Sequence, residues 1–180
     1  NKELDALFLC VTNTPIAISI AEKLLVLLTS KTLIIDITTH NQNGSKDMDK
    51  IFAKKNISYV ECPVMGGPVQ AEEGVLGGIV GATEENFKKA ESYLKNFCKD
   101  YFYFGEVGAG AKSKLLNNFL SIGTATLVIE LIKSAKKMNI DLQKLFSVAK
   151  LGSGNSAALN RIFDKVLQND YTGFRFSTSN

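Results

Sequence analysis

Residues 105–118 read GEVGAGAKSKLLNN, a glycine loop that runs directly into a helix-forming segment. Strand and helix patterns alternate before this loop, whereas only helix patterns follow it, so the loop marks a change of architecture. On the helix, the spacings i, i+3 and i, i+4 stack the amine of Lys114 beside the amides of Asn117 and Asn118. An ammonium group flanked by amides at the mouth of a glycine loop is a candidate proton donor to a carbonyl oxygen.

Three continuous apolar runs of strand length precede the loop, at residues 6–11, 32–37 and 58–62. Such runs are typical of parallel strands that are covered on both faces. Thr14 caps a predicted helix with Pro15 at its first position, and a lysine-rich helix is predicted at 45–55. Strands and helices alternating at this spacing predict right-handed crossovers and a parallel sheet.

The remainder of the first half is rich in glycine. Residues 63–82 contain six glycines and a predicted strand at 75–80. Thr83 caps a predicted helix that runs to about residue 97, since the acidic residues after it suit the first turn of a helix. A short aromatic strand is predicted at 101–104.

Only helices are predicted after the loop: a long one at 111–138, one that Asp141 caps and that ends at Gly152, and one at 156–167. The sequence therefore predicts two domains, an α/β domain at 1–106 and a helical domain at 107–180.

Composition limits the class of protein. The 180 residues are 45% hydrophobic and 22% charged, which is typical of a globular chain. The net charge is only +3, and the lysines lie opposite apolar helix faces without an arginine cluster, so we expect no nucleic-acid partner. We also expect no membrane partner, because no apolar run reads as long enough to span a bilayer and no targeting signal is visible at the first residues.

Cysteine and histidine usage narrows the location and the chemistry. Cys10, Cys62 and Cys98 are odd in number and far apart, which favours free thiols and a reducing, intracellular compartment. His40 is the single histidine, which argues against a multi-histidine metal site and a histidine-based triad. We therefore expect no metal.

A phosphate-binding loop is the first alternative for the glycine loop, because that loop follows a strand and opens a helix. Such a loop needs adjacent Gly and Lys, but Ala111 intervenes and turns Lys112 by about 100° on the helix. The acidic strand that ends in Asp36 also precedes the loop instead of following it. The alternative is therefore disfavoured.

Asp36 could alternatively be the ribose-binding acid of a dinucleotide fold, but that role requires G-x-G-x-x-G about 20 residues upstream. The turn at 12–15 contains no glycine. We therefore interpret Asp36 as a strand-end residue and expect Thr38 and Thr39 to line a cleft at the carboxyl ends of the strands.

The helix after the loop also has a purely structural interpretation. Most helical lysines are simply exposed to solvent, and Lys112 is a better candidate for such a surface lysine than Lys114. Adjacent asparagines such as Asn117 and Asn118 are poor helix formers, so in an otherwise apolar helix they need a reason. Together with the glycine loop, these residues favour a functional site.

The motifs together resemble the β-hydroxyacid dehydrogenase family, which includes 3-hydroxyisobutyrate dehydrogenase and phosphogluconate dehydrogenase. Residues 36–39 (DITT) are similar to the family's D-x-S-T segment, and residues 63–76 (PVMGGPVQAEEGVL) to its P-V-S-G-G…A-x-x-G-x-L block. The loop and helix at 105–118 are similar to its G-x-x-G-x-G-x-x-x-K-x-x-N-N block, and Gly152-Ser153-x-x-Ser156 to a serine-containing segment. The resemblance implies an α/β fold in which the distal part of a Rossmann-type parallel sheet is followed by an all-α domain, joined by a long helix.

The resemblance also implies a function: NAD- or NADP-dependent oxidation of a small β-hydroxy acid, or the reverse reduction. Separately, we expect a homodimer, because a helical domain that exposes a long apolar face usually buries it against a partner. The resemblance implies that Lys114 is the general acid/base and that Asn118 orients it. The implied substrate-binding residues are Thr38, Met65, Gly66, Gly67 and Asn117, and the implied cofactor-binding residues are Val11, Thr12 and Thr39. The compartment would be cytoplasmic or organellar, the mitochondrion included.

Three departures from the family pattern shape these expectations. The G-x-G-x-x-G fingerprint is absent, so we expect the first βαβ unit to be missing and this fragment alone to be inactive. Met65 stands at the usual serine and Pro68 follows, which removes a hydroxyl donor and indicates a bulkier or less acidic substrate. The chain also ends near 174–177, where the family continues toward a cofactor-contacting lysine, so the helical domain is expected to be partial. A non-catalytic, dehydrogenase-like interaction module is the competing hypothesis.

Overall fold

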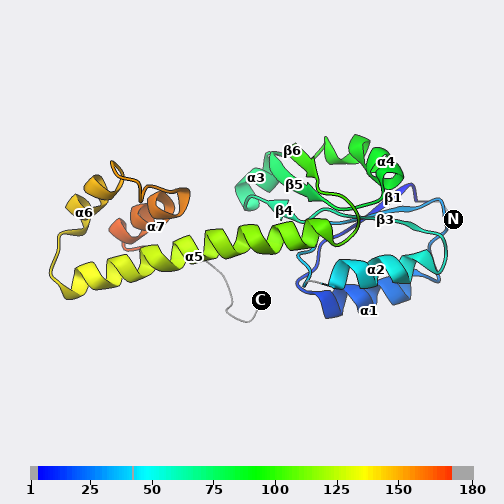
Figure 1. The fold of residues 1–180 in the computed structure, drawn as a ribbon, viewed down its shortest axis with the longest axis horizontal. Coiled ribbons are helices and arrows are strands. Elements are labelled where there is room, and N and C mark those ends of the chain that lie inside the picture. The colour runs from blue at the N-terminus through cyan, green and yellow to red at the C-terminus, as the bar shows by residue number, and fades with distance from the viewer. Residues whose placement is uncertain (1–3, 42, 172–180) are drawn as a thin grey trace. The chain divides into compact units, whose positions relative to one another are not determined.

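The computed structural model describes residues 4–41 and 43–171 of the chain. It consists of two compact units, residues 1–116 and 117–180, which are described separately here (Figure 1). The stretch 174–177, where the family pattern was expected to continue, lies outside the described residues.

The first unit opens with a parallel sheet of three strands. Its strand order is β1 (Ala6–Leu9), β2 (Leu33–Asp36), β3 (Ser58–Glu61), and the connecting helices are α1 (Thr14–Leu24) and α2 (Gly44–Ala53). All three predicted strands are confirmed, each slightly shorter than its apolar run. The parallel direction brings the carboxyl ends of the strands to one edge of the sheet.

A second three-stranded sheet follows, with α3 (Pro68–Glu72) and α4 (Glu84–Leu94) as its helices. Its strand order is β4 (Val64–Met65), β5 (Leu76–Val80), β6 (Cys98–Tyr103), with β4 antiparallel to β5 and β6 parallel to it. The sequence did not predict β4 or α3, because elements this short carry no periodicity. A bridge between Glu61 and Gly81 connects the end of β3 to the end of β5.

Both faces of the first sheet are covered, which explains why its strands are continuously apolar. Ile34 packs with residues of α1 and α2, whereas Leu33 and Ile35 point to the opposite face and pack with Ala90 and Leu94 of α4. Figure 1 shows α1 and α2 together on one side of the strands and α4 on the other.

The predicted start of α1 needs a correction. Asn13, not Thr14, is the N-cap, because its side chain accepts the backbone N–H of Ile16 at 3.1 Å. Thr14 is the first helical residue, and its hydroxyl contacts the Nδ1 atom of buried His40 at 3.1 Å instead. The predicted caps at Thr83 and Asp141 are confirmed, and the helix predicted at 156–167 begins one residue later, with Ser156 as its N-cap.

The second unit contains only helices within its described residues. They are the greater part of α5 (Ala109–Lys137), then α6 (Leu142–Ala149) and α7 (Ala157–Leu167). Val128 and Ile132 of α5 pack against Phe146 of α6 and Phe163 of α7, whose two rings stack at a centroid distance of 4.9 Å.

The expectation that no apolar run is long enough to span a membrane is wrong for α5. Its 29 residues include a window of mean hydropathy 1.6, which satisfies the length and composition of a spanning helix. The sequence reading missed it because small and polar residues interrupt the apolar ones. One such helix is weak evidence for a membrane span; Ala125, Val128 and Ile132 pack in a core, although only 17% of the apolar window is buried.

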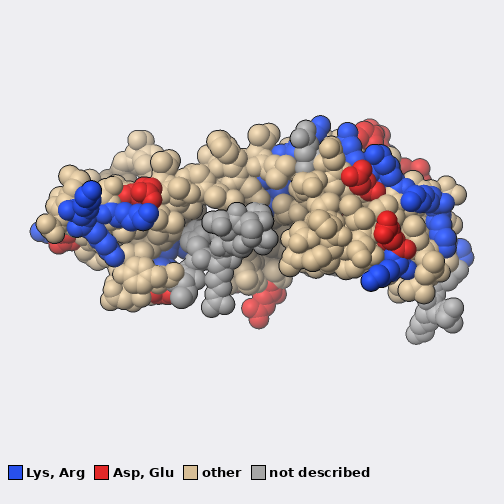
Figure 2. Space-filling model, turned by 90° about the horizontal axis from the view of Figure 1, so that it is seen from below, with Lys and Arg blue, Asp and Glu red and all other residues tan. Residues whose placement is uncertain are grey.

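Basic and acidic side chains lie close to one another at several places on the surface. On the face drawn in Figure 2, basic and acidic side chains are interspersed, with uncharged surface between them. Several are paired locally, as in Lys89 with Glu85 at 2.7 Å and Lys133 with Glu130 at 2.7 Å.

Candidate active site

Lys114 lies in the second turn of α5 and is directed toward β4. Its Nζ donates a hydrogen bond to the carbonyl oxygen of Val64 at 2.7 Å and another to Sδ of Met65 at 3.3 Å. The residue is only 9% exposed. The structure places the predicted lysine against the Val64-Met65 pair instead of in open solvent.

Burial lowers the pKa of Lys114 below the ordinary value for lysine, and no charged side chain contributes to the change. Desolvation disfavours the ammonium form, so the neutral amine becomes accessible nearer to neutral pH. A buried amine that can exist in both forms is suited to general acid–base catalysis.

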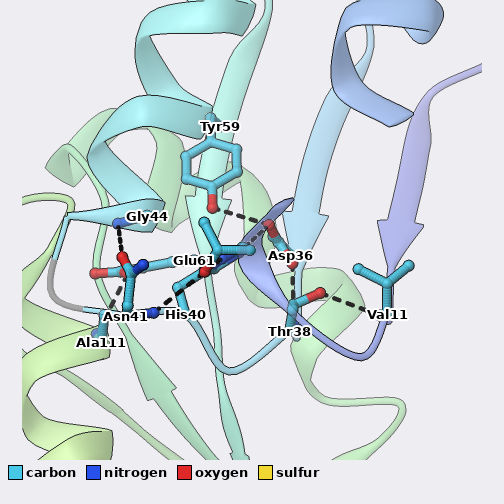
Figure 3. Close-up of polar contacts among 10 residues, drawn as sticks. Val11, Asp36, Thr38, His40, Asn41, Gly44, Tyr59, Glu61 and Ala111 are labelled. Carbon is cyan, nitrogen blue, oxygen red and sulfur yellow. Dashed lines mark hydrogen bonds and ion pairs between the residues drawn. The ribbon is translucent and has the colours of Figure 1, made fainter. Parts of the chain in front are cut away.

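Glu61 anchors the start of the helix that carries Lys114. Its Oε1 accepts the backbone N–H groups of Gly108 at 2.6 Å and Gly110 at 2.8 Å, and its Oε2 accepts that of Ala111 at 3.3 Å. Glu61 is fully buried, and burial raises its pKa against the opposing effect of these backbone donors. Figure 3 shows Glu61 in the region of Ala111 at the start of α5.

The Glu61 contacts count against the phosphate-loop alternative. In a phosphate loop the free amides at the helix start bind the ligand, whereas here three of them already donate to an internal carboxylate. The sequence analysis missed Glu61. A usable signal existed, because a carboxylate at the end of a buried strand requires donors, and a glycine loop can supply them.

The glycines of the loop are needed for close packing. Gly108 has φ of +98°, a conformation that favours glycine. A Cβ on Gly110 would lie 2.8 Å from the carbonyl oxygen of Ile79 and 3.0 Å from Oε1 of Glu61. The loop therefore lets α5 start directly against β5 and the Glu61 carboxylate.

Asp36 is the centre of a second buried network (Figure 3). Its Oδ2 contacts Nε2 of His40 at 2.8 Å and accepts the hydroxyl of Tyr59 at 3.0 Å, while its Oδ1 accepts the N–H of Thr38 at 3.0 Å. Burial, followed by the charges of Asp36 and Glu61, raises the pKa of Tyr59. Asp36 is fully buried and engaged, which agrees with its interpretation as a strand-end residue and not as a ribose ligand.

The residues predicted along the cofactor lie at the carboxyl ends of β1 and β2. The hydroxyl of Thr38 accepts the N–H of Val11 at 3.2 Å, so the two strand ends are joined. Thr12 and Thr39 are exposed beside this contact, whereas Thr38 is only 2% exposed. The predicted residues therefore come together, with Thr38 as the connecting member.

The double glycine of the predicted substrate site follows β4. Gly66 has φ of +118°, and an added Cβ would lie 2.8 Å from Cδ2 of Leu76, so only glycine fits there. The N–H of Gly67 donates to Oε1 of Gln70 at 2.8 Å. That amide would have to exchange partners to bind a substrate carboxylate.

Asn117 and Asn118 follow Lys114 on the same uninterrupted helix, so the predicted i+3 and i+4 spacings are helical as expected. Both asparagines belong to the second unit, whose first residue is Asn117. Within the described parts of the chain, no group of three or more His, Cys, Asp or Glu side chains could hold a metal ion.

Comparison with known proteins matches nearly the whole chain. The model of the NAD-binding domain of 6-phosphogluconate dehydrogenase matches residues 1–105, and that of the NAD-binding domain of NADP-dependent 3-hydroxyisobutyrate dehydrogenase matches residues 108–179. The chain is 31% identical to 2-(hydroxymethyl)glutarate dehydrogenase of Eubacterium barkeri over 143 residues, covering 79% of this chain and 48% of the relative. It is 33% identical to 3-hydroxyisobutyrate dehydrogenase of Pseudomonas aeruginosa over 141 residues, covering 76% and 46%.

The fold agrees with solved structures. The structure of 3-hydroxyisobutyrate dehydrogenase from Salmonella typhimurium superimposes with a TM-score of 0.82 at 20% identity, covering 93% of this chain and 60% of that one. The chain spans about half the length of the curated relatives it matches.

Proposed function

This chain belongs to the β-hydroxyacid dehydrogenase family, and we propose that it acts in the NAD(P)-dependent oxidation of a small β-hydroxy acid or the reverse reduction of the matching carbonyl compound. The observation that carries the proposal is the amine of Lys114, which is buried, partly desolvated and held by two uncharged acceptors. In an oxidation, this amine would take the proton of the substrate hydroxyl. In the reduction, the ammonium would return it.

Both matched models describe NAD-binding domains, which makes NAD or NADP the cofactor of this family. The nicotinamide supplies hydride transfer, the part of the chemistry that no side chain can provide. The joined ends of β1 and β2 fit such a group, since Val11 and Thr38 are bonded and Thr12 and Thr39 are exposed beside them. The glycine loop does not fit the phosphates, because its amides donate to Glu61.

The remaining roles extend the proposal to substrate binding. We assign orientation of the substrate and of Lys114 to Asn118, with Asn117 nearby. The substrate carboxylate would be held by Thr38 and by the backbone of Gly66 and Gly67. The positive φ of Gly66 supports this role, because it favours glycine, and glycine leaves the backbone of that turn uncovered by a side chain. In this proposal, residues 1–106 form part of the NAD(P)-binding domain, and residues 107–180 form part of the helical domain.

We further propose that the protein is a homodimer and intracellular. The helix α5 exposes many large apolar side chains: Leu115, Leu116, Phe119, Leu120, Ile122, Leu127, Ile129 and Leu131. Phe119 alone is 81% exposed, and an apolar helix face of this extent is usually covered by another chain. An intracellular location agrees with Cys10, Cys62 and Cys98, which are all free thiols.

The test compares two lysines of the same helix in the full-length protein. Lys114→Met should abolish turnover of β-hydroxy acids while nicotinamide cofactor affinity, measured by fluorescence titration, is retained. Lys112→Met is the matched control, because Lys112 is exposed and lies two residues away. Equal turnover in both variants would refute the proposal, and cofactor binding without any turnover in the wild type would favour the non-catalytic interaction module.

A further inference from the structure

Met65 occupies an unusual place for a thioether, because its sulfur accepts a hydrogen bond from a buried amine. Sδ lies 3.3 Å from Nζ of Lys114, and the neighbouring carbonyl oxygen of Val64 lies 2.7 Å from the same nitrogen. Both acceptors belong to β4, which is paired with Gly77 and Gly78 of β5. The sheet therefore holds the backbone of both residues, and the Met65 side chain places its sulfur beside the same nitrogen that the Val64 carbonyl accepts from.

The number of hydrogens on the amine decides what this arrangement does. A neutral amine carries two N–H bonds and one lone pair, whereas the ammonium carries three N–H bonds. The carbonyl of Val64 and the sulfur of Met65 can only accept, so together they take both hydrogens of the neutral form. The lone pair, or the third hydrogen of the ammonium, is then directed away from β4 by the tetrahedral geometry of the nitrogen.

We propose that Met65 is a positioning residue that aims the lone pair of Lys114 at the substrate hydroxyl and sets the proton affinity of the amine. This inference rests on the proposed function for its substrate, and on the two contacts of Nζ for its geometry. A serine at this place could donate its own hydrogen to the lone pair and so block it. A thioether cannot, because it has no hydrogen to donate.

The sulfur also affects the proton affinity. A thioether is a weaker acceptor than a hydroxyl or water, so it stabilises the ammonium less. Val64 and Met65, the two residues that accept from Nζ, are uncharged, and burial lowers the pKa of Lys114. Replacing the sulfur should therefore change this pKa.

The main experiment measures the pKa of Lys114 directly by NMR of the full chain with ¹³C,¹⁵N-labelled lysine. The signal is assigned by its loss in Lys114→Met. Met65→Ser should raise the pKa toward the ordinary value, and Met65→Leu, which keeps the volume but lacks the acceptor, should lower it further. Each change should alter the neutral fraction at a fixed lower pH by about threefold. Met138→Leu, at an exposed methionine of the second unit, is the control and should leave the signal unchanged.

A second measurement does not depend on any variant folding. In selenomethionine-labelled protein, the ⁷⁷Se shift of residue 65 should titrate with the same midpoint as Nζ of Lys114. An unchanged Lys114 pKa in both Met65 variants, or a selenium shift that does not follow the lysine, would overturn the inference. If the pKa changes as expected but Lys114→Met still turns over hydroxy acids, the proposed function and the aiming of the lone pair at a substrate fail, while the effect of Met65 on the proton affinity of Lys114 stands.

Discussion

Gly110 and Gly123 lie in the same helix, yet alanine should affect them in opposite ways. At Gly110, an added Cβ would lie 2.8 Å from the carbonyl oxygen of Ile79, 3.0 Å from the N–H nitrogen of Gly81 and 3.0 Å from Oε1 of Glu61. Two of these atoms belong to the backbone and the third to a buried carboxylate, so none can move freely. At Gly123, no atom lies within 4 Å of the added Cβ.

The magnitudes follow from packing and helix propensity. Overpacking a tight site costs about 1–3 kcal/mol, which the gain of up to about 1 kcal/mol from replacing a helical glycine only partly offsets. Gly110→Ala should therefore destabilise the protein by about 1–2 kcal/mol. Gly123→Ala should stabilise it by about 0.5–1 kcal/mol, since only helix propensity changes.

Urea titration followed by circular dichroism measures both variants, and native-state hydrogen exchange assigns each change to its own unit. Gly110→Ala should also shift the start of α5, so the amide protons of residues 108–111 should exchange faster. If Gly110→Ala equals or exceeds the wild type in stability, the close approach of α5 to β5 and Glu61 is refuted.

Three further predictions concern the buried charges and the apolar helix. Glu61→Ala leaves three backbone N–H groups without their acceptor and should lower the free energy of unfolding, measured by urea titration, by about 3 kcal/mol or more. A decrease below about 1 kcal/mol would contradict the anchoring role of Glu61. Burial lowers the pKa of Lys114 in the folded protein below its ordinary value of 10.5. Below that lowered pKa, the buried ammonium group reduces the stability of the folded state. This destabilisation disappears as the pH rises from the lowered pKa toward 10.5. Lys114→Met should therefore be more stable than the wild type at neutral pH, and the difference in unfolding free energy between the two should become smaller at alkaline pH. A difference that does not change with pH would count against burial of the charge. If the protein forms the proposed homodimer, Leu116→Asp on α5 should shift it toward the 19.6 kDa monomer in light scattering, whereas Val26→Asp, at another exposed apolar residue, should not.

Several elements were predictable because their signals are local. The runs at 6–11, 32–37 and 58–62 became β1, β2 and β3, since continuous apolar runs need cover on both faces. The caps at Thr83 and Asp141 were recognisable because a single side chain bonds an amide three residues later.

The failures have equally specific causes. Asn13 and Thr14 are both good capping residues, and only the contact of Thr14 with distant His40 makes Asn13 the cap. The strand β4 has two residues and no periodicity, so it exists only because β5 is there to pair with it. The burial of Lys114 against Met65 follows from that pairing.

The amino-acid sequence by itself determined the order of the longer strands and helices and singled out Lys114 as a candidate, because apolar patterning, capping and motif spacing act within a few residues. Only the tertiary structure decided which polar groups meet. Glu61 accepts amides 47 to 50 residues away, and Lys114 donates to Val64 across 50 residues. The physical reason is that a buried charge must find its partner in space, and chain folding, not sequence distance, sets which groups come within hydrogen-bonding reach.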